Sequence, residues 1–293
     1  MQCQSPFNVK SKNLDIRNEN LMTPVPCGKC IPCLKRRSSH WSFRINEESK
    51  KAKTSCFLTL TYEKAPLSTN GLPTLLKKDY QNFFKRLRKL VPAQKGKNRL
   101  KYFACGEYGT KTARPHYHAI VFNLPQDIIN SATQIRDTWK HGHVLVTPSN
   151  LATINYVVGY ITKGGTKKII DKEFGIYDDR VPEFQLMSKG LGECYLTPAM
   201  TKYYRDRQIA CIIHENGHIL SMPRYYKEKR IRKDGEYGLF DKSELKNLFK
   251  EWLEIQEMKT PDFLEMDGKT KRDVWIDMVD KREKTLTLKR AKL

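Results

Sequence analysis

The sequence has no long hydrophobic run, and no apolar stretch approaches the roughly 20 residues that a membrane-spanning helix requires. The opening residues MQCQSPFNVKSKN lack the apolar segment of a secretory signal peptide. Acidic residues are scarce relative to basic ones, because 32 Asp and Glu stand against 54 Lys and Arg, for a formal net charge of +22. We therefore expect a cytoplasmic protein whose partner is a polyanion, with nucleic acid the first candidate and an anionic membrane surface the second.

Internal repeats and low-complexity segments are also lacking, so the fold has to be inferred from hydrophobic periodicity. Alternation predicts strands at 56–62, 100–109, 114–125 and 142–147. Helical periodicity predicts helices at 74–91, 126–140 and 149–165, the last with Ser149 or Asn150 as its N-cap. The order β-α-β-β-α-β, followed by a helix, predicts an α+β protein with a ferredoxin-like split βαβ antiparallel sheet. We expect the helices to cover one face of the sheet and to leave the other face free for a site.

The two ends of the chain have weaker patterns. Residues 1–45 read as basic and irregular, whereas 212–221 predicts a hairpin and 242–258 a helix. We therefore expect three parts, a Cys-rich N-terminal extension (1–50), a central domain (51–170), and a basic, partly helical C-terminal region (171–293).

The strand around ARPHYHAIVF raises a chemical question, because His116 and His118 alternate onto one face about 7 Å apart. At that separation two imidazoles can bind one divalent ion. Glu107 ends the preceding strand and would join them if it lies opposite His116, although the register is not given by the sequence. Two His and a carboxylate would leave positions open for phosphate oxygens. The alternative is an exposed sheet face that carries two histidines by chance.

Two other histidine pairs resemble metal motifs. His141 and His143 form a second His-x-His at a helix-to-strand junction, which we interpret as structural or incidental. His214 and His218 fit the His-Glu-x-x-His pattern of zinc proteases, but that chemistry needs a helix. Because Asn-Gly lies between them, and is a poor helix former and a strong hairpin turn, a protease is a remote alternative.

Tyr156, Tyr160 and Lys163 are spaced i, i+4, i+7 and so share one face of the predicted helix. Such a pair of tyrosines often serves only for packing. Beside a metal site, however, a tyrosine hydroxyl can attack a DNA phosphodiester and store the bond energy as a 5′-phosphotyrosine. Lys163 would then contact the phosphate or a metal-bound water.

Cysteines fall into two groups. Cys27, Cys30 and Cys33 have the spacing C-x₂-C-x₂-C, and Cys3 could complete a four-thiolate zinc site. The spacing also fits iron–sulfur ligation, and a third possibility is that no metal binds. The other cysteines have apolar neighbours and are predicted to pack as small side chains, namely Cys56, Cys105, Cys194 and Cys211.

A basic stretch follows the cysteines directly. Lys35, Arg36 and Arg37 could contact phosphates, and Trp41 could stack on a base. The alternative is that this charge run is only a solvated surface.

Several motifs, taken together, resemble a known family. FLTLTY, GEYG with RPHYHAIVF, and YVVGYITKG resemble the three ordered motifs of rolling-circle replication initiators of the HUH endonuclease superfamily. PCGKCIPCLKRRSSHWSFR, FFKRLRK, MSKGLG and PRYY are similar to stretches in replication initiation proteins of small single-stranded DNA phages, the microviruses, especially their gokushovirus-like branch. The resemblance covers most of residues 1–230.

This resemblance implies an HUH endonuclease fold for 51–170. It implies that His116 and His118 are a metal pair for Mg²⁺ or Mn²⁺, with Glu107 as third ligand. It also implies that Tyr160 is the nucleophile of a Tyr-x-x-Lys element and Tyr156 the second tyrosine. Such an enzyme nicks single-stranded origin DNA through a 5′-phosphotyrosine intermediate and religates the displaced circular strand.

The partners implied are the origin DNA of a small circular phage genome and the replication machinery of a bacterial host cytoplasm, without a membrane or a small-molecule substrate. The sequence contains no G-x-x-x-x-G-K-[ST] phosphate-binding loop, so we expect a host helicase to separate the strands. The alternatives are an HUH relaxase, transposase or plasmid initiator and, more distantly, a non-enzymatic zinc-stabilised DNA-binding protein.

Overall fold

The computed structural model describes residues 3–10, 22–91, 99–110, 112–162, 169–171, 176–207, 211–213 and 219–227. The chain forms two compact units, one of residues 26–202 and one of residues 2–25 with 203–293. The three-part division expected from the sequence stays a prediction.

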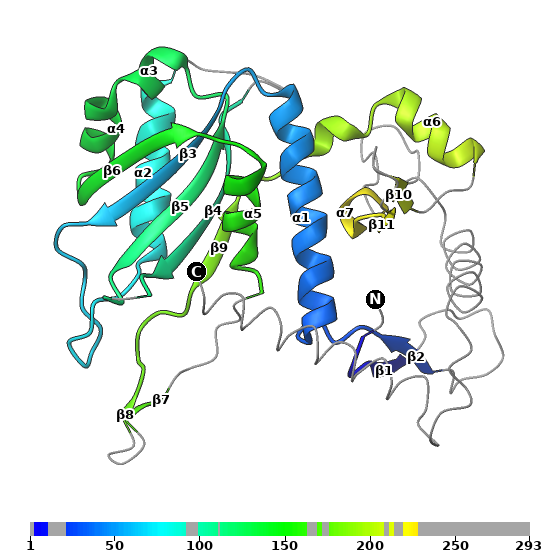
Figure 1. Cartoon of the computed structure of the whole chain (residues 1–293), viewed down its shortest axis with the longest axis horizontal. Helices are drawn as coiled ribbons and strands as arrows, with labels where there is room; N and C mark the ends of the chain where they lie inside the picture. Colours follow the sequence, from blue (N-terminus) through cyan, green and yellow to red (C-terminus); the bar gives the residue numbers. More distant parts are fainter. Residues whose placement is uncertain are drawn as a thin grey trace. The chain divides into compact units, whose positions relative to one another are not determined.

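The first unit is built around a five-stranded antiparallel sheet with the order β6-β3-β5-β4-β9 (Figure 1). Its strands are β3 (Ser55–Tyr62), β4 (Lys101–Tyr108), β5 (Pro115–Phe122), β6 (Gly142–Pro148) and β9 (Phe184–Met187). The α+β class and all four predicted strands are confirmed, and β5 separates β3 from β4 as in a split βαβ unit. Strand β9 was not predicted, because FQLM is short and has no alternating burial.

The connecting helices are α2 (Lys77–Leu90), α3 (Gln126–Asn130), α4 (Ala132–Trp139) and α5 (Leu151–Gly159). The single helix expected at 126–140 is two helices, because the chain leaves helical geometry at Ser131. Asn150 caps α5 through a reciprocal pair of hydrogen bonds with Thr153. Helix α5 ends at Gly159, earlier than the expected 165, and residues 163–168 lie outside the described part of the chain.

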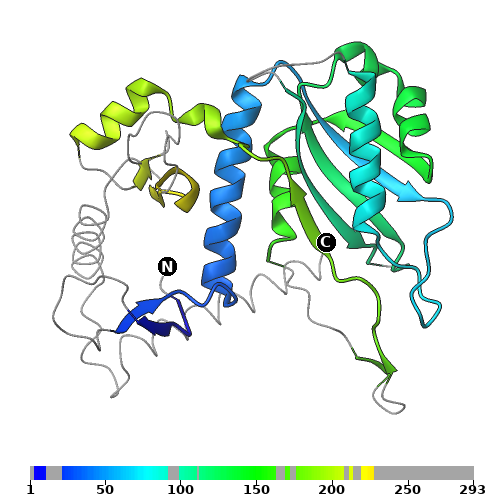
Figure 2. The same cartoon turned by 180° about the vertical axis from the view of Figure 1, so that it is seen from behind.

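Helices pack on both faces of the sheet. Helices α2 and α4 cover one face of the sheet, which is seen from behind in Figure 2. The core on this face includes Tyr117, Phe83 and Trp139. On the opposite face α5 and the long helix α1 (Ile31–Lys51) pack over β4 and β5, where Ile45, Ile120 and others form a second core. The expectation that helices cover only one face is therefore wrong, because a large part of the second face also carries apolar side chains that need burial.

Helix α1 also corrects the expectation that residues 1–45 are irregular. Its buried side includes charged residues, which obscured the helical pattern. Arg44 donates hydrogen bonds to the Leu191 carbonyl at 3.1 and 2.7 Å, and Lys101 Nζ lies 2.7 Å from Glu48 Oε1. Because these buried charges are paired, their burial is tolerated.

The smaller elements in the described residues are β1 (Phe7–Lys10), β2 (Met22–Val25), β7 (Ile169–Asp171), β8 (Ile176–Tyr177), the 3-10 helix η2 (Glu193–Tyr195), α6 (Pro198–Asp206), β10 (Cys211–Ile213), β11 (Ile219–Ser221) and α7 (Arg224–Lys227). Strands β10 and β11 pair antiparallel, as the predicted hairpin requires. The Asn-Gly turn with His214 and His218, and the helix predicted at 242–258, lie outside the described residues. No helix in the described part of the chain is both long and apolar enough to cross a membrane.

Candidate metal centre and active site

Strand register brings three potential metal ligands together. Glu107 of β4 lies directly opposite His116 of β5, which is the register that places the carboxylate on the histidine face. His118 lies two residues further along β5 and on the same face. Their ligand atoms all lie within 4.8 Å of one another. The sheet therefore holds two imidazoles and a carboxylate in one small group. The spacing of these residues in the sequence did not determine the register of β4 and β5 or the burial of the three side chains.

The two histidines point the same nitrogen toward Glu107. His116 Nε2 lies 2.6 Å and His118 Nε2 lies 2.8 Å from Glu107 Oε1. Each Nδ1 has a second partner, the Arg114 carbonyl at 2.9 Å for His116 and Thr59 Oγ1 at 3.0 Å for His118. Hydrogen bonds of this kind orient a metal-binding histidine and fix which nitrogen is available to the metal.

These contacts are suited to a cation. A carbonyl oxygen only accepts, so the Arg114 carbonyl fixes the proton on Nδ1 of His116 and leaves Nε2 without one when the ring is neutral. Two acceptor atoms then face each other at 2.6 Å, which is favourable only with a proton or a metal ion between them. Two imidazoles and one carboxylate suit a divalent metal and leave coordination positions open. The residues present therefore fit a catalytic metal ion.

The pKa shifts agree with a site made for positive charge. Burial raises the pKa of Glu107, but hydrogen bonds and charge from His116 and His118 outweigh it and lower the pKa to about 2. Burial lowers the pKa of His116, but the hydrogen bonds to Glu107 and to the Arg114 carbonyl and the nearby negative charges together outweigh it, and the net shift is upward. Glu107 is thus a carboxylate across the physiological range, ready to bind a cation.

The two tyrosines continue this group. Tyr156 donates a hydrogen bond to Glu107 Oε1 at 3.1 Å, and its hydroxyl is 3.5 Å from His118 Nε2. Tyr160, the residue directly after α5, is buried and donates to the Tyr156 hydroxyl at 2.8 Å. Tyr156 is 47% exposed and so is open to a substrate. The two tyrosines share one face and their hydroxyls are hydrogen-bonded to each other, whereas Lys163 lies outside the described residues.

Helix α5 is positioned from two directions. Its buried residues Ile154, Val157 and Val158 pack in the second core. Ser42 of α1 donates a hydrogen bond to Asn155 Oδ1 at 2.6 Å, directly beside Tyr156 in sequence. These contacts set the distance of the tyrosines from the sheet.

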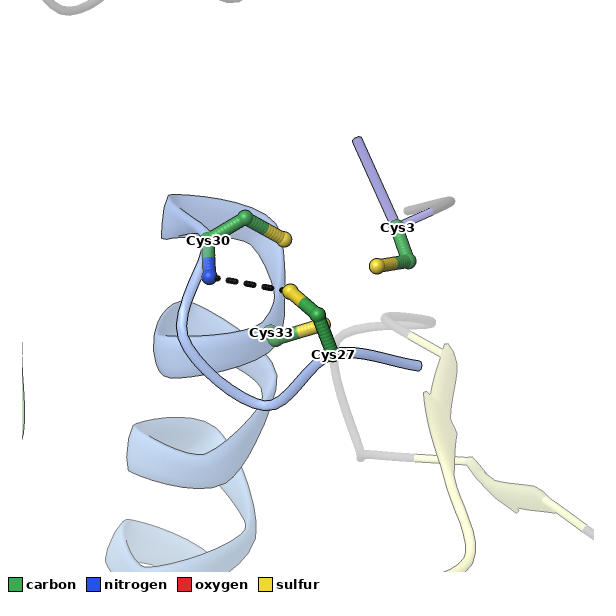
Figure 3. A group of neighbouring side chains, drawn as sticks. All are labelled: Cys3, Cys27, Cys30 and Cys33. Atoms are coloured by element: carbon green, nitrogen blue, oxygen red, sulfur yellow. Dashed lines mark hydrogen bonds between the residues drawn. The ribbon is translucent and has the colours of Figure 1, made fainter. Parts of the chain in front are cut away.

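The N-terminal cysteines also gather. The Sγ atoms of Cys3, Cys27, Cys30 and Cys33 lie within 4.8 Å of one another, and Figure 3 shows them pointing toward one another. Cys27 Sγ accepts the Cys30 backbone N–H at 3.2 Å and the Lys29 N–H at 3.4 Å. Such donors stabilise the thiolate form that binds metal. The predicted grouping of these four thiols is present, and the identity of any metal is a separate question.

The remaining cysteines divide by burial. Cys56 and Cys105 are buried in the sheet, as expected of packing residues, and burial raises the pKa of Cys56 to about 12. Cys194 and Cys211 are half-buried, and burial also raises the pKa of each thiol.

The basic stretch predicted to bind DNA lies on α1. Arg37 is exposed, whereas Lys35 and Arg36 are half-buried. The Trp41 ring packs against Phe103, with a centroid distance of 5.1 Å, and the Arg44 guanidinium lies 4.1 Å from its centroid. These contacts favour a packing role for Trp41, and its base stacking stays a prediction.

The second His-x-His pair is divided between two environments. His141 packs against Trp139 and Tyr62, and its Nε2 lies 4.0 Å from Asp79 Oδ1. His143 is exposed on β6, opposite Thr61, which also lies opposite His116. The structure does not bring His141 and His143 together.

Two contributors to the site were missed at the sequence level. Thr59 and Arg114 orient the histidines through a hydroxyl and a backbone carbonyl. Arg114 itself donates to the Tyr62 carbonyl at 3.0 Å through Nε, which anchors the start of β5 to β3. Alternation in FLTLTY places Thr59 on the same face as Thr61, but only the β3–β5 register pairs Thr59 with His118.

Comparison with known proteins gives the class. A protein-family model for replication-associated proteins of the ORF2 type matches residues 55–165. Replication-associated protein ORF2 of Spiroplasma virus 4 is 30% identical over 227 residues, which cover 71% of this chain and 68% of that protein. Replication-associated protein VP4 of Bdellovibrio phage phiMH2K is 29% identical over 250 residues, or 80% and 76% of the two chains. Replication-associated protein ORF4 of Chlamydia phage 1 is 29% identical over 238 residues, or 73% and 56%.

No solved structure matches the chain. The residues 55–165 matched by the family model contain strands β3 to β6 with Glu107, His116 and His118, so the match covers the part of the sheet that carries the candidate site. The chain belongs to the ORF2-type family of replication-associated proteins of small, microvirus-type phages. The resemblance to replication proteins of microvirus-type phages, which the sequence motifs indicated, is thereby confirmed.

Proposed function

We propose that this protein is a rolling-circle replication initiator with an HUH endonuclease fold, which nicks single-stranded origin DNA by tyrosine attack. One observation carries the proposal. The Tyr156 hydroxyl lies 3.1 Å from a carboxylate oxygen that is itself 2.6 and 2.8 Å from two histidine nitrogens. A nucleophile next to metal-type ligands, in a phage replication protein with charge +22, fits DNA cleavage better than DNA binding alone.

The residues that would hold the metal ion, Mg²⁺ or Mn²⁺, are Glu107 through Oε1 and His116 and His118 through Nε2. When bound, the ion supplies Lewis-acid polarisation of the scissile phosphate. Burial, and next the negative charge of Glu107, raise the pKa of Tyr156. Its hydroxyl therefore needs help to lose a proton, and the hydrogen bond at 3.1 Å holds it beside the Glu107 oxygen that would bind the metal ion.

The tyrosine oxygen attacks phosphorus, the bond from phosphorus to the 3′-oxygen breaks, and the 3′-oxygen leaves as a hydroxyl after taking a proton. The 5′ end stays on the protein as a phosphotyrosine. Reversing the reaction with another 3′-hydroxyl reseals a strand, which gives the religation of the displaced circle. No net oxidation or hydrolysis occurs, so the nick conserves the phosphodiester energy.

The two tyrosines would share the work. The Tyr-x-x-Lys spacing favours Tyr160 as the nucleophile. Contact and exposure favour Tyr156 for the first cut, because its hydroxyl is 3.1 Å from Glu107 Oε1 and its side chain is 47% exposed, whereas Tyr160 is buried. We therefore propose Tyr156 for the first cut and Tyr160 for the second. Occupation of Tyr156 by a DNA end would release the Tyr160 hydroxyl from their shared hydrogen bond. Lys163 remains proposed as a phosphate contact.

A structural Zn²⁺ at Cys3, Cys27, Cys30 and Cys33 is the second part of the proposal, supported by the four converging sulfurs and the N–H donors to Cys27. Elemental analysis of protein purified under reducing conditions should find about one zinc per chain. Cys27→Ser with Cys30→Ser should lose the zinc and lower the melting temperature, because metal binding contributes folding free energy. Cys194→Ser is the matched control and should keep the zinc. Iron in place of zinc would favour a cluster, and no metal at all would contradict the site.

The proposed partners are the single-stranded origin of a small circular phage genome and the helicase and replication machinery of a bacterial host cytoplasm. Contact with phosphates through Lys35, Arg36 and Arg37 is part of this proposal. A relaxase, transposase or plasmid initiator would use the same chemistry on another DNA. A non-enzymatic DNA-binding protein would not cut at all.

The deciding experiment is nicking of labelled single-stranded oligonucleotides tiled across the genome that encodes the protein. We expect cleavage at one sequence, dependent on Mg²⁺ or Mn²⁺ and abolished by a chelator, with the downstream fragment attached to the protein through its new 5′ end. A cut at the phage origin distinguishes the initiator from a transposase. Binding without cleavage of any oligonucleotide would reject the nickase in favour of the DNA-binding alternative.

A further inference from the structure

Part of the metal-bearing sheet face has no helix over it among the described residues. It consists of Thr61 on β3 and His143, Leu145 and Thr147 on β6, here called the β6 lane. His143 lies across from Thr61, which lies across from His116, so alternation puts the lane on the face that carries the metal ligands. His143 and Leu145 are exposed, and Leu145 has 59% of its surface free.

The β6 lane is continuous with the proposed site. Glu107, His116, Thr61 and His143 follow one another in a single row across four neighbouring strands. Neighbouring strands are about 4.8 Å apart, so His143 is about 10 Å from His116 along this row. Phosphates in one strand of duplex DNA are about 3.4 Å apart along the axis. A strand with its scissile phosphate at the metal ligands thus covers the row within two or three nucleotides.

The chemistry of the lane suits nucleic acid better than protein. Leu145 is one apolar side chain between an imidazole and two hydroxyl groups, which is too little apolar surface for a protein interface. A flat apolar contact beside hydrogen-bonding groups matches the faces and edges of unstacked bases. The row ends where the Glu63 N–H donates a hydrogen bond to the His141 carbonyl at 2.8 Å, which joins the chain after β3 to the chain before β6. Lys64 and Lys140, which flank these two residues in the sequence, are exposed and carry two positive charges against the one negative charge of Glu63.

We propose that the β6 lane binds the nucleotides of the single-stranded DNA next to the scissile phosphate, with Leu145 contacting a base and His143 a phosphate or base edge. This rests on the proposed function for its substrate. It goes further in assigning the track of the strand, which runs from the metal ligands outward over β3 and β6 to the edge of the sheet. It also gives His143 a role that its His-x-His pattern did not suggest.

The test is affinity of the full-length protein for a single-stranded oligonucleotide of the phage origin, measured by fluorescence anisotropy with a chelator present so that no cleavage occurs. Leu145→Glu adds a negative charge to the lane and should weaken binding about tenfold. Leu90→Glu is the matched control, because Leu90 is an exposed leucine of α2, which packs on the opposite face, and should leave binding unchanged. Equal affinities of the two variants would overturn the proposal.

Two further measurements show whether a loss of affinity comes from the lane itself rather than from misfolding or from the added charge. First, both leucines are exposed, so the melting temperatures of both glutamate variants should match that of the parent protein. Second, the double variant Leu145→Gln, His143→Ala repeats the affinity test without an added charge and should still weaken binding several-fold. If Leu145→Glu instead disrupts a dimer in solution without changing DNA affinity, the lane is a surface for a second copy and the proposal is wrong. Failure of the parent protein to nick would reject the proposed function but leave the binding test valid.

Discussion

Two His-x-His sequences occur in this chain, at 116–118 and 141–143, and the sheet treats them differently. His116 and His118 both lie within β5, point one nitrogen each at Glu107, and have a second partner for the other nitrogen. His141 precedes β6 and packs on Trp139, whereas His143 is exposed within β6. The same three-residue pattern therefore yields one convergent pair and one divided pair.

Gly142 is the reason for the division. Its φ of +138° is rarely adopted by other residues, and a Cβ at this position would lie 2.4 Å from Glu63 N and 2.6 Å from the Thr61 carbonyl oxygen. Glycine allows the backbone this conformation at the start of β6, where the His141 ring packs on Trp139 and the His143 side chain is exposed. Tyr117, by contrast, is an ordinary buried strand residue, and its neighbours emerge together on the other face. A pair of ligands is therefore produced by a regular strand with a carboxylate on the neighbouring strand, not by the pattern itself.

The largest expected effect is the loss of nicking when one histidine of the pair His116 and His118 is replaced. His116→Ala or His118→Ala should reduce nicking roughly a thousandfold or more, because the proposed metal loses a ligand and phosphate polarisation with it. DNA affinity should change little, since it comes mostly from distributed positive charge. His141→Ala is the matched control and should nick at nearly the parent rate. Quantitative nicking assays with anisotropy measurements decide this, and full activity in the His116→Ala, His118→Ala double variant would remove the proposed mechanism.

The tyrosines next to the first pair give the second test. Tyr156→Phe should remove most of the adduct on a simple oligonucleotide, because phenylalanine keeps the ring contacts with His118 and Phe57 and deletes only the hydroxyl. Tyr160→Phe should still form the first adduct but fail to cut while a DNA end is attached.

Mass spectrometry of the trapped adduct locates the phosphotyrosine. An adduct only at Tyr160 in the parent protein would restore the order favoured by the Tyr-x-x-Lys spacing. Adducts at neither residue would exclude the two-tyrosine mechanism altogether.

The turn that divides the second pair gives the third test. Gly142→Ala should lower the free energy of unfolding by about 2–4 kcal/mol, since a Cβ there meets backbone atoms rather than flexible side chains. Gly109→Ala is the control, because the nearest atom to its added Cβ is at an ordinary 3.7 Å. Chemical denaturation of both variants measures the difference. Equal stabilities would show that the backbone at Gly142 tolerates a side chain.

The smallest effect concerns the hydrogen bond that orients His118. Thr59→Val removes the hydroxyl at 3.0 Å from Nδ1 and should weaken Mn²⁺ affinity about tenfold. Thr147→Val, on the same face of the edge strand, should bind Mn²⁺ as the parent does. Isothermal titration of the metal compares the two variants, and unchanged affinity in Thr59→Val would mean that the ring is oriented by packing on Phe57, whose centroid is 5.3 Å away.

Local rules accounted for much of this molecule. Alternation alone put His116 and His118 on one face, because side chains point to opposite sides of a strand in turn. Periodicity located four of the five sheet strands, and Asn150 was recognisable as a cap because its side chain satisfies backbone groups within the next turn. These features depend on residues within a few positions of one another, where the covalent geometry of the chain leaves few choices.

Contacts between distant residues were decided by tertiary structure. Helix α1 was not predicted from the sequence, because a charged residue such as Glu48 is expected at the surface unless its partner is known. That partner, Lys101, is 53 residues away in the sequence. The match of Glu107 with His116 depends on the register of two strands, and a slip by one residue would turn the carboxylate to the other face. The contact between the Tyr156 hydroxyl and Glu107 depends on how α5 packs on the sheet. Ser42 of α1 contributes to that packing through its hydrogen bond to Asn155. Packing and the pairing of polar groups throughout the folded unit determine which side chains come together. No short stretch of sequence contains that information.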